Sequence, residues 1–404
     1  MVWLLGQLHD NGTVEAENAQ IEFRASPRFS GKPLPDITNV DASRSEQSNS
    51  TIIVDNQAVL KFYRRISRGV SPEVEMGRFL TDVVGFAHAP ALLGTVELVE
   101  KVARSTLAVM HEFVENQGDA WSFTTAYLDR MLEEARLLTG EASVDPQRHA
   151  AFFHRMTVLG RRLGELHLAL ASRPDYPDFA PEPATPADLK EWTERLVTAT
   201  ERIFDRLKKD RRKLDPKTQE LAATVIDQRE ALLKAVRKLL PAKLDVDKIR
   251  HHGDFHLGQT LIVKDDAFII DFEGEPHRSE AERQAKAPSA RDAAGLIRSL
   301  DYAATTALNA VTQSSPEEAA RMTQAIEQWR RHSEAAFLAG IREVAGTGRL
   351  WPQDSDTAQR LLRFYVAEKA IYEIGYELAN RPEWVPVPLS GVTRAILTET
   401  KAPA

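Results

Sequence analysis

Two aspartates and a glutamine stand in an order that suits phosphoryl transfer. Asp254 precedes Gln259 by five residues, and Asp271 follows the apolar run 267–270. Residues 260–263 and 268–270 read as two short strands around the polar turn 264–266, so we predict a hairpin that brings Asp254 and Gln259 close to Asp271. Carboxylate and amide oxygens suit Mg²⁺, which also binds phosphate oxygens. The order therefore predicts a phosphotransferase loop in which Asp254 accepts a hydroxyl proton and Gln259 and Asp271 hold the metal.

A lysine lies inside an apolar strand pattern earlier in the chain. Residues 52–54 and 58–63 predict two strands joined by a tight turn, and Lys61 belongs to the second strand. An ammonium among apolar side chains needs an anionic partner or must reach water. Kinases place their phosphate-binding lysine in such a strand. The structural alternative is an edge-strand lysine that only keeps the strand soluble.

The partner of Lys61 is expected on a helix that begins after Ser71. Ser71 is a suitable N-cap, and Pro72 suits the first helical turn. Two glutamates, Glu73 and Glu75, follow at positions from which either could reach Lys61, and we favour Glu75. Both could instead be first-turn acids that complement the helix dipole.

Two further segments are predicted to contact a nucleotide. In the polar segment 47–51, hydroxyls and backbone N–H groups of Ser48, Asn49 and Ser50 are expected to cover phosphates. The segment 111–114 is expected to cross between two lobes, where the backbone of Glu112 and Val114 would meet an adenine edge. The chain lacks the sequence G-x-x-x-x-G-K-[ST], which excludes a P-loop nucleotide-binding protein.

Composition narrows the class of protein. The chain has 404 residues, a net charge of -7 and no cysteine, which excludes disulfides and thiolate metal sites. A mildly acidic chain has no general attraction for nucleic acid or anionic lipid. No run approaches the roughly 20 apolar residues that a membrane span needs. We therefore expect a cytoplasmic protein with neither a nucleic-acid nor a membrane partner.

The pattern along the chain predicts three parts. Residues 1–46 are expected to be a short N-terminal cap and linker, with residues 2–5 and 19–23 as strands around the turn Asn11-Gly12. Residues 47–115 predict a small, mainly β lobe. Residues 116–404 predict a large helical lobe that contains the catalytic loop 251–275.

One predicted helix, 361–380, carries polar and aromatic residues on a common stripe. Lys369, Tyr372 and Glu373 recur at spacings of one, three or four residues. Aromatic faces beside charged groups suit a sugar, because the rings contact C–H faces and the charges bind hydroxyls. The alternative is a helix held by i,i+4 ion pairs and packed by its tyrosines.

As a set, these motifs resemble the maltokinases, including the maltokinase-like domains fused to trehalose synthases. The resemblance runs from about residue 47 to the end of the chain and rests on the segments 47–49, 59–61, 72–80, 116–121, 252–259, 270–276, 291–292 and 368–373. It implies an α+β, two-lobed fold like that of eukaryotic protein kinases and related to the aminoglycoside phosphotransferases.

The resemblance also implies a reaction and its residues. The γ-phosphate of ATP would pass, with Mg²⁺, to the anomeric hydroxyl of maltose, giving maltose 1-phosphate for α-glucan synthesis, and a trehalose synthase domain would be a partner. Asp254 would be the base, Gln259 and Asp271 the metal ligands, and Lys61 with Glu75 the phosphate-binding pair. The sugar would be held by His256, Lys369, Tyr372 and Glu373. A glucosamine-type sugar kinase and a non-catalytic kinase-like domain remain alternatives.

Overall fold

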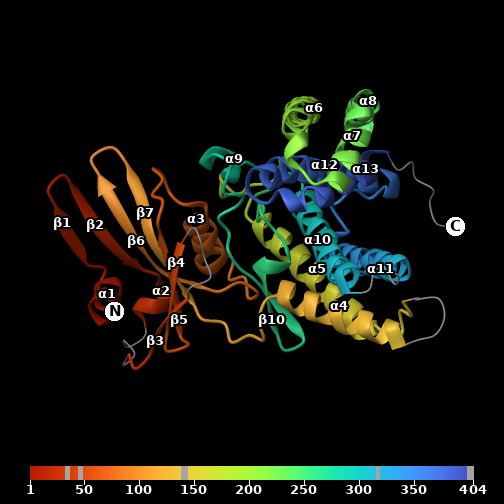
Figure 1. The fold of residues 1–404 in the computed structure, drawn as a ribbon. Helices are drawn as coiled ribbons and strands as arrows, with labels where there is room; N and C mark the ends of the chain where they lie inside the picture. Colours follow the sequence, from red (N-terminus) through yellow and green to blue (C-terminus); the bar gives the residue numbers. More distant parts are fainter. Residues whose placement is uncertain (32–36, 44–48, 138–143, 315–318, 398–404) are drawn as a thin grey trace. The chain divides into compact units, whose positions relative to one another are not determined.

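The computed structural model describes residues 1–31, 37–43, 49–137, 144–314 and 319–397, and the chain divides into two compact units (Figure 1). The sheet unit comprises Met1–Gly118, His252–Asp254 and Gln259–Ala285. The helical unit comprises Asp119–His251, Phe255–Gly258 and Lys286–Ala404.

Among the described residues, the sheet unit contains a seven-stranded antiparallel sheet in the order β1-β2-β6-β7-β5-β4-β3. Two short helices, α1 and α2, precede β3, and α3 continues into η1 between β5 and β6. The strands are β1 (Thr13–Ala16), β2 (Ala19–Ala25), β3 (Val40–Ser43), β4 (Asn49–Val54), β5 (Ala58–Tyr63), β6 (Leu92–Glu100) and β7 (Arg104–Glu112), and the helices are α1 (Val2–His9), α2 (Pro27–Ser30), α3 (Pro72–Arg78), η1 (Phe79–Val83) and α9 (Glu280–Gln284).

The first 46 residues differ from the expected cap in two ways. Residues 2–5, predicted as a strand, lie in helix α1, because Leu5 and Leu8 bury the same helical face three residues apart. The hairpin turn does not fall at Asn11-Gly12, since Ala16 pairs with Ala19. Strand β2, predicted at 19–23, pairs along β6, so this segment extends the sheet of the small lobe.

Apolar side chains cover the two faces of the sheet differently. On one face, α1 and α2 close a core that includes Leu8, Phe23 and Leu60. On the other face, Val74 of α3 packs against Leu92 and Val109. Because side chains alternate along a strand, Lys61 lies on the α3 face and Leu60 on the α1 face.

The helical unit is organised around long helices that bury one stripe each. Helix α5 packs along α11, and α10 contacts α4, α11 and α12. The described elements are α4 (Ala120–Leu137), α5 (Ala150–Leu170), β8 (Glu182–Pro183), α6 (Pro186–Asp210), η2 (Arg211–Lys213), α7 (Pro216–Asp227), α8 (Arg229–Leu239), β9 (Asp247–Lys248), η3 (Leu257–Gln259, which ends in the sheet unit), α10 (Ala290–Ser314), α11 (Ala319–Ala345), α12 (Ser355–Asn380), η5 (Pro382–Trp384) and α13 (Pro386–Leu397).

Candidate active site

The hairpin predicted from the sequence is present. Strand β10 (Thr260–Val263) pairs with β11 (Asp266–Ile269), and Lys264 adopts the left-handed conformation that its tight turn requires, with φ 56°. The backbone N–H of Ile270 donates to the carbonyl of Gln259 over 3.0 Å. The two ends of the hairpin therefore meet as expected, and Gln259 Nε2 donates to Asp271 Oδ2 over 2.7 Å.

Lys61 lies at the centre of a group of carboxylates. Its Nζ is 2.6 Å from Asp271 Oδ1 and 3.2 Å from Glu73 Oε2, and it also forms an ion pair with Glu273. Lys61 is 8% exposed, so its ammonium is not the water-facing charge of an edge strand. The structure thus joins Lys61, Asp271 and Gln259, three residues that the sequence predicted for one site.

The ion pair between Lys61 and α3 uses Glu73, and the preference for Glu75 was wrong. Glu73 is 3% exposed and also accepts a hydrogen bond from Tyr63 Oη over 2.5 Å. His111 Nε2 lies 3.3 Å from its other oxygen. Glu75, two residues further along the helix, instead accepts from Gln284 Nε2 over 3.4 Å. Two residues correspond to about 200° of helical rotation, so the two carboxylates leave α3 in different directions.

Glu273 also belongs to the carboxylate group, although it is not among the site residues predicted from the sequence. In a continued strand, residues 271 and 273 would point to the same face. The strand ends at Ile269, however, and Asp271 has a left-handed φ of 66°, which breaks the alternation. The Glu273 carboxylate contacts Lys61 and also accepts from Asn49 Nδ2 over 3.1 Å.

The pKa values of Lys61, Glu73 and Glu273 depend on one another, because the charged groups lie close together. Burial disfavours the ammonium of Lys61, but attraction to Glu73, Asp271 and Glu273 outweighs it and holds its pKa well above the usual value. Burial acts against ionised Glu73 too, yet Lys61 and His111 hold the pKa of Glu73 below its usual range. For Glu273 burial prevails and raises the pKa to about 7.

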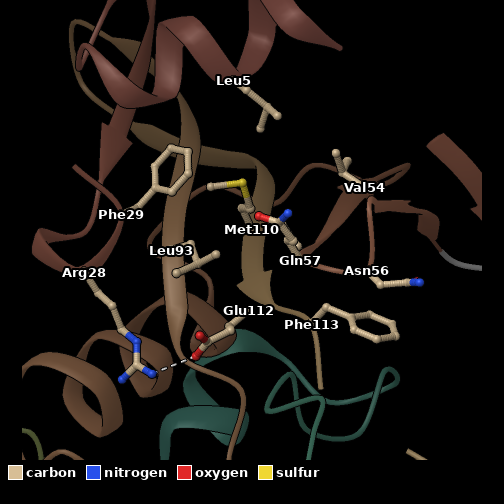
Figure 2. A pocket seen from close by; sticks show the side chains of 11 residues that line it. Leu5, Arg28, Phe29, Val54, Asn56, Gln57, Leu93, Met110, Glu112 and Phe113 are labelled. Atoms are coloured by element: carbon tan, nitrogen blue, oxygen red, sulfur yellow. Dashed lines mark hydrogen bonds and ion pairs between the residues drawn. The ribbon is translucent and has the colours of Figure 1, made fainter. Parts of the chain in front are cut away.

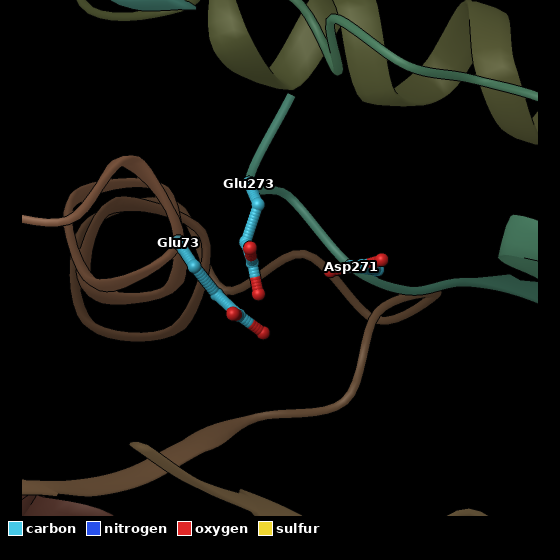
Figure 3. Close-up of side chains that lie close together, drawn as sticks. All are labelled: Glu73, Asp271 and Glu273. Carbon is cyan, nitrogen blue, oxygen red and sulfur yellow. The ribbon is translucent and has the colours of Figure 1, made fainter. Parts of the chain in front are cut away.

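The three carboxylates form a candidate cation site. Ligand oxygens of Glu73, Asp271 and Glu273 lie within 4.8 Å of one another. Figure 3 shows Glu73 and Glu273 extending toward each other from α3 and from the segment after β11. Three carboxylates around one ammonium leave an excess of negative charge, and oxygen donors are the ligands that Mg²⁺ prefers. The residues therefore fit the metal predicted for Asp271 and Gln259.

Asp254 is held in place by its neighbours in the loop. Its backbone N–H donates to His252 Nδ1 over 3.3 Å, and His252 Nε2 donates to the carbonyl of Ile270 over 2.9 Å. Gly253, with φ 87°, allows the sharp turn between these residues. The histidine thereby ties the predicted base to the segment that follows β11 and contains Asp271.

Of the residues predicted to cover phosphate, Asn49 alone lies beside the carboxylate group among those that the structure describes. Ser48 lies outside the described residues. Ser50 pairs with Phe62, which places its side chain on the face opposite Lys61, and its Oγ accepts from Arg64 Nε over 3.1 Å.

Glu112 also lies on the opposite face of the sheet. Its side chain is paired with Arg28 over 2.9 Å at the edge of a cavity of about 310 Å³, which Figure 2 shows beside Phe29, Leu93 and Met110. The backbone N–H of Glu112 donates to the carbonyl of Ala91. These contacts direct Glu112 away from Lys61. The carbonyl of Val114 accepts from Asn116 Nδ2 over 2.8 Å.

The predicted sugar ligands lie in the helical unit. On α12, Lys369 Nζ stands 5.2 Å from the centre of the Tyr372 ring. Glu373 is buried, and Arg298 Nε donates to it over 2.8 Å, so its carboxylate already has a buried cationic partner. His256 Nδ1 accepts from the backbone N–H of Gly258, which shapes η3. Sugar binding by these residues stays a prediction, and the Arg298 contact argues against Glu373.

Known proteins with similar sequences give a second line of evidence beside the geometry of the site. The chain matches no protein-family model. It is 26% identical over 352 residues to a glucosamine kinase of Streptacidiphilus jiangxiensis, which covers 85% of this chain and 70% of the relative. A glucosamine kinase of Mycolicibacterium smegmatis is 24% identical over 344 residues, covering 85% and 76%.

A solved glucosamine kinase in complex with glucosamine, ADP and inorganic phosphate aligns with 97% of this chain and 81% of its own, with a TM-score of 0.67 and 22% identity. The chain has a kinase fold. The expected α+β, protein-kinase-like class is thereby confirmed, with a small sheet unit and a large helical unit. The relatives support a sugar phosphotransferase, whereas maltokinase in particular has no support among them.

The described residues also include no helix with the length and apolarity needed to cross a bilayer.

Proposed function

We propose that this protein is an ATP-dependent sugar kinase whose acceptor is an amino sugar, with glucosamine as the first candidate. The observation that carries the proposal is the meeting of Lys61, Glu73, Asp271 and Gln259 at one end of the β10–β11 hairpin. A strand lysine paired with a helix glutamate, beside a metal-binding aspartate, is the arrangement that kinases use for nucleotide phosphates. The acceptor comes from the similarity to glucosamine kinases.

Each residue has a defined part in the proposed reaction. Lys61, oriented by Glu73, would hold phosphate oxygens of ATP. Asp271 and Gln259 would hold Mg²⁺; Gln259 donates through Nε2, so its carbonyl oxygen is the atom suited to a cation. When bound, the metal supplies positive charge that neutralises phosphate oxygens. The sugar hydroxyl attacks the γ-phosphorus, the bond from that phosphorus to ADP breaks, and Asp254 takes the hydroxyl proton.

The experiment measures ADP release with ATP and Mg²⁺ across glucosamine, glucose, maltose, trehalose and an aminoglycoside, and Asp254→Asn is the control for contaminating activity. We expect turnover with glucosamine that exceeds turnover with glucose at least tenfold, because the amino group adds a charged contact. Maltose is the competing acceptor, since the sequence motifs resemble maltokinases. Turnover with maltose alone would replace the amino sugar and would make a trehalose synthase the partner to test next. ATP binding without release for any sugar would favour a non-catalytic domain.

A further inference from the structure

One oxygen of Glu273 contacts both Asn49 and Lys61, two residues that are predicted to bind phosphate. Asn49 Nδ2 donates to Glu273 Oε1 over 3.1 Å, and Lys61 Nζ forms its ion pair with the same oxygen. Asn49 is 6% exposed and Lys61 is 8% exposed, so both donors are enclosed beside Glu273. The carboxylate therefore makes the contacts that an anionic phosphate oxygen would make with these donors.

The backbone holds Glu273 in this position. Asp271 and Gly274 have left-handed φ values of 66° and 74°, so the segment turns after β11. Arg283 Nη1 from α9 donates to the carbonyl of Glu273 over 3.2 Å, which fixes the turned segment. The approach of Glu273 to Lys61 is thus a consequence of the local fold.

Of the three carboxylates around Lys61, that of Glu273 can move away from the ammonium with the least change in structure. Glu73 has a side chain that is 4% exposed and that also accepts from Tyr63, so α3 holds it firmly. Asp271 accepts from Gln259, which retains it at the hairpin. The Glu273 side chain is 22% exposed and extends from a turn, where a change of rotamer disturbs no helix or strand.

We propose that Glu273 is a place-holder that competes with nucleotide phosphate for Lys61 and Asn49. This inference rests on the proposed function, because it concerns the binding of nucleotide at the same site. Phosphate binding and the Glu273 contacts exclude one another, so a nucleotide must displace the carboxylate. A carboxylate released beside Asp271 suits a cation, so Mg²⁺ favours the displaced arrangement and nucleotide binding together.

The test is calorimetric titration of the whole chain with ADP in EDTA, with ADP in Mg²⁺ and with adenosine. Glu273→Gln is expected to bind ADP in EDTA about tenfold more tightly than wild type, because the competing charge is gone. The gain in ADP affinity from Mg²⁺ should shrink. Adenosine, which has no phosphate, should bind both chains equally. Glu15→Gln removes one exposed charge from β1 and should leave all three affinities unchanged.

Two outcomes would overturn the inference while leaving the proposed function intact. One is wild-type ADP binding that Glu273→Gln does not alter in EDTA. The other is an equal gain for adenosine, which would show a general change of the pocket. If Glu273→Gln does not fold, Glu273→Asp retains the charge but shortens the reach to Lys61, and a smaller gain in ADP affinity is expected. A wild-type chain that binds no nucleotide with or without Mg²⁺ would overturn both.

Discussion

The positive charge of the Lys61 ammonium offsets part of the negative charge in the candidate site. Three carboxylates approach it, and burial makes each unpaired charge costly. Glu73 is the most enclosed of the three, since its side chain is 4% exposed. Loss of Lys61 would therefore leave mutually repelling acids as well as remove the contact with phosphate.

Lys61→Ala should weaken ATP binding by about tenfold or more, because a charged hydrogen bond to phosphate is lost. Calorimetry with ATP and Mg²⁺ measures this directly. Unchanged affinity and turnover would return Lys61 to a purely structural role in β5.

Glu73→Gln and Glu75→Gln separate the two acids of α3. Glu73→Gln should lower the free energy of unfolding by about 1–3 kcal/mol and reduce turnover, since the buried partner of Lys61 loses its charge. Glu75→Gln should change stability by less than about 0.5 kcal/mol, because its carboxylate is partly exposed and contacts Gln284. Denaturant unfolding of both variants measures the change in stability, and ADP release measures the change in turnover. The reverse ranking would contradict the observed pairing.

Asp254→Asn should lower turnover by about 100-fold or more while the chain remains folded. Asparagine cannot accept the hydroxyl proton, but the hydrogen bond that positions residue 254 uses its backbone N–H and is retained. Single-turnover kinetics together with the thermal midpoint measure both effects. Near-normal turnover would exclude Asp254 as the base.

At the scale of elements, helices α5 and α11 meet through two glycines. A Cβ on Gly160 would lie 1.9 Å from the carbonyl oxygen of Phe337, and one on Gly340 would lie 2.0 Å from that of Thr157. Because both obstacles are backbone atoms, a methyl group at either position must force the helices apart. The core of the helical unit depends on this approach.

Gly160→Ala should therefore destabilise the protein by about 1–3 kcal/mol, although alanine has the higher helix propensity. Gly6→Ala in α1 is the matched control, since no atom beyond its chain neighbours and the adjacent helix backbone lies within 4 Å of an added Cβ, and it should stabilise by about 0.5–1 kcal/mol. Thermal unfolding of both variants tests the contrast. A stabilised Gly160→Ala would refute the close helix contact.

At the scale of the whole molecule, a buried histidine makes stability depend on pH. Burial lowers the pKa of His251 to about 4. The charge of Asp292 opposes this shift because it favours the protonated imidazole, whereas the charges of Arg291, Arg250 and His167 add to the shift. The unfolded chain therefore binds more protons than the folded one between about pH 6.5 and pH 4. His251 makes the folded state lose stability as the pH falls through this window.

From pH 7 to pH 5, this effect should cost about 2 kcal/mol. Glu273 acts in the opposite direction, because its raised pKa of about 7 favours the folded state on acidification. The informative quantity is thus the difference between wild type and His251→Gln. Between pH 7 and pH 5, the free energy of unfolding measured in urea should fall less for the variant than for wild type. Parallel losses would contradict a neutral buried His251.

The order of residues along the chain was enough to predict the hairpin and the meeting of Lys61, Gln259 and Asp271, whereas the role of Asp254 stays a prediction. Those predictions rest on alternation, turn residues and motif spacing, which act over a few residues. The bounds of helices are less well predicted: the helix predicted at 361–380 begins earlier, at Ser355, and ends at Asn380. Helix ends are defined to within only one or two residues, and a local pattern marks them weakly.

Only the tertiary structure decided which side chains meet. Rotation of α3 about its axis selected Glu73 over Glu75, and packing against Leu92 and Val109 sets that rotation. Asp271 adopts a left-handed backbone, and Glu273, two residues later, meets Lys61 from a strand some 210 residues earlier in the chain. Strand register sent Ser50 and Glu112 to the opposite face, because a shift of one residue reverses every side chain. Register and rotation depend on partners far away in the chain, and no local pattern records them.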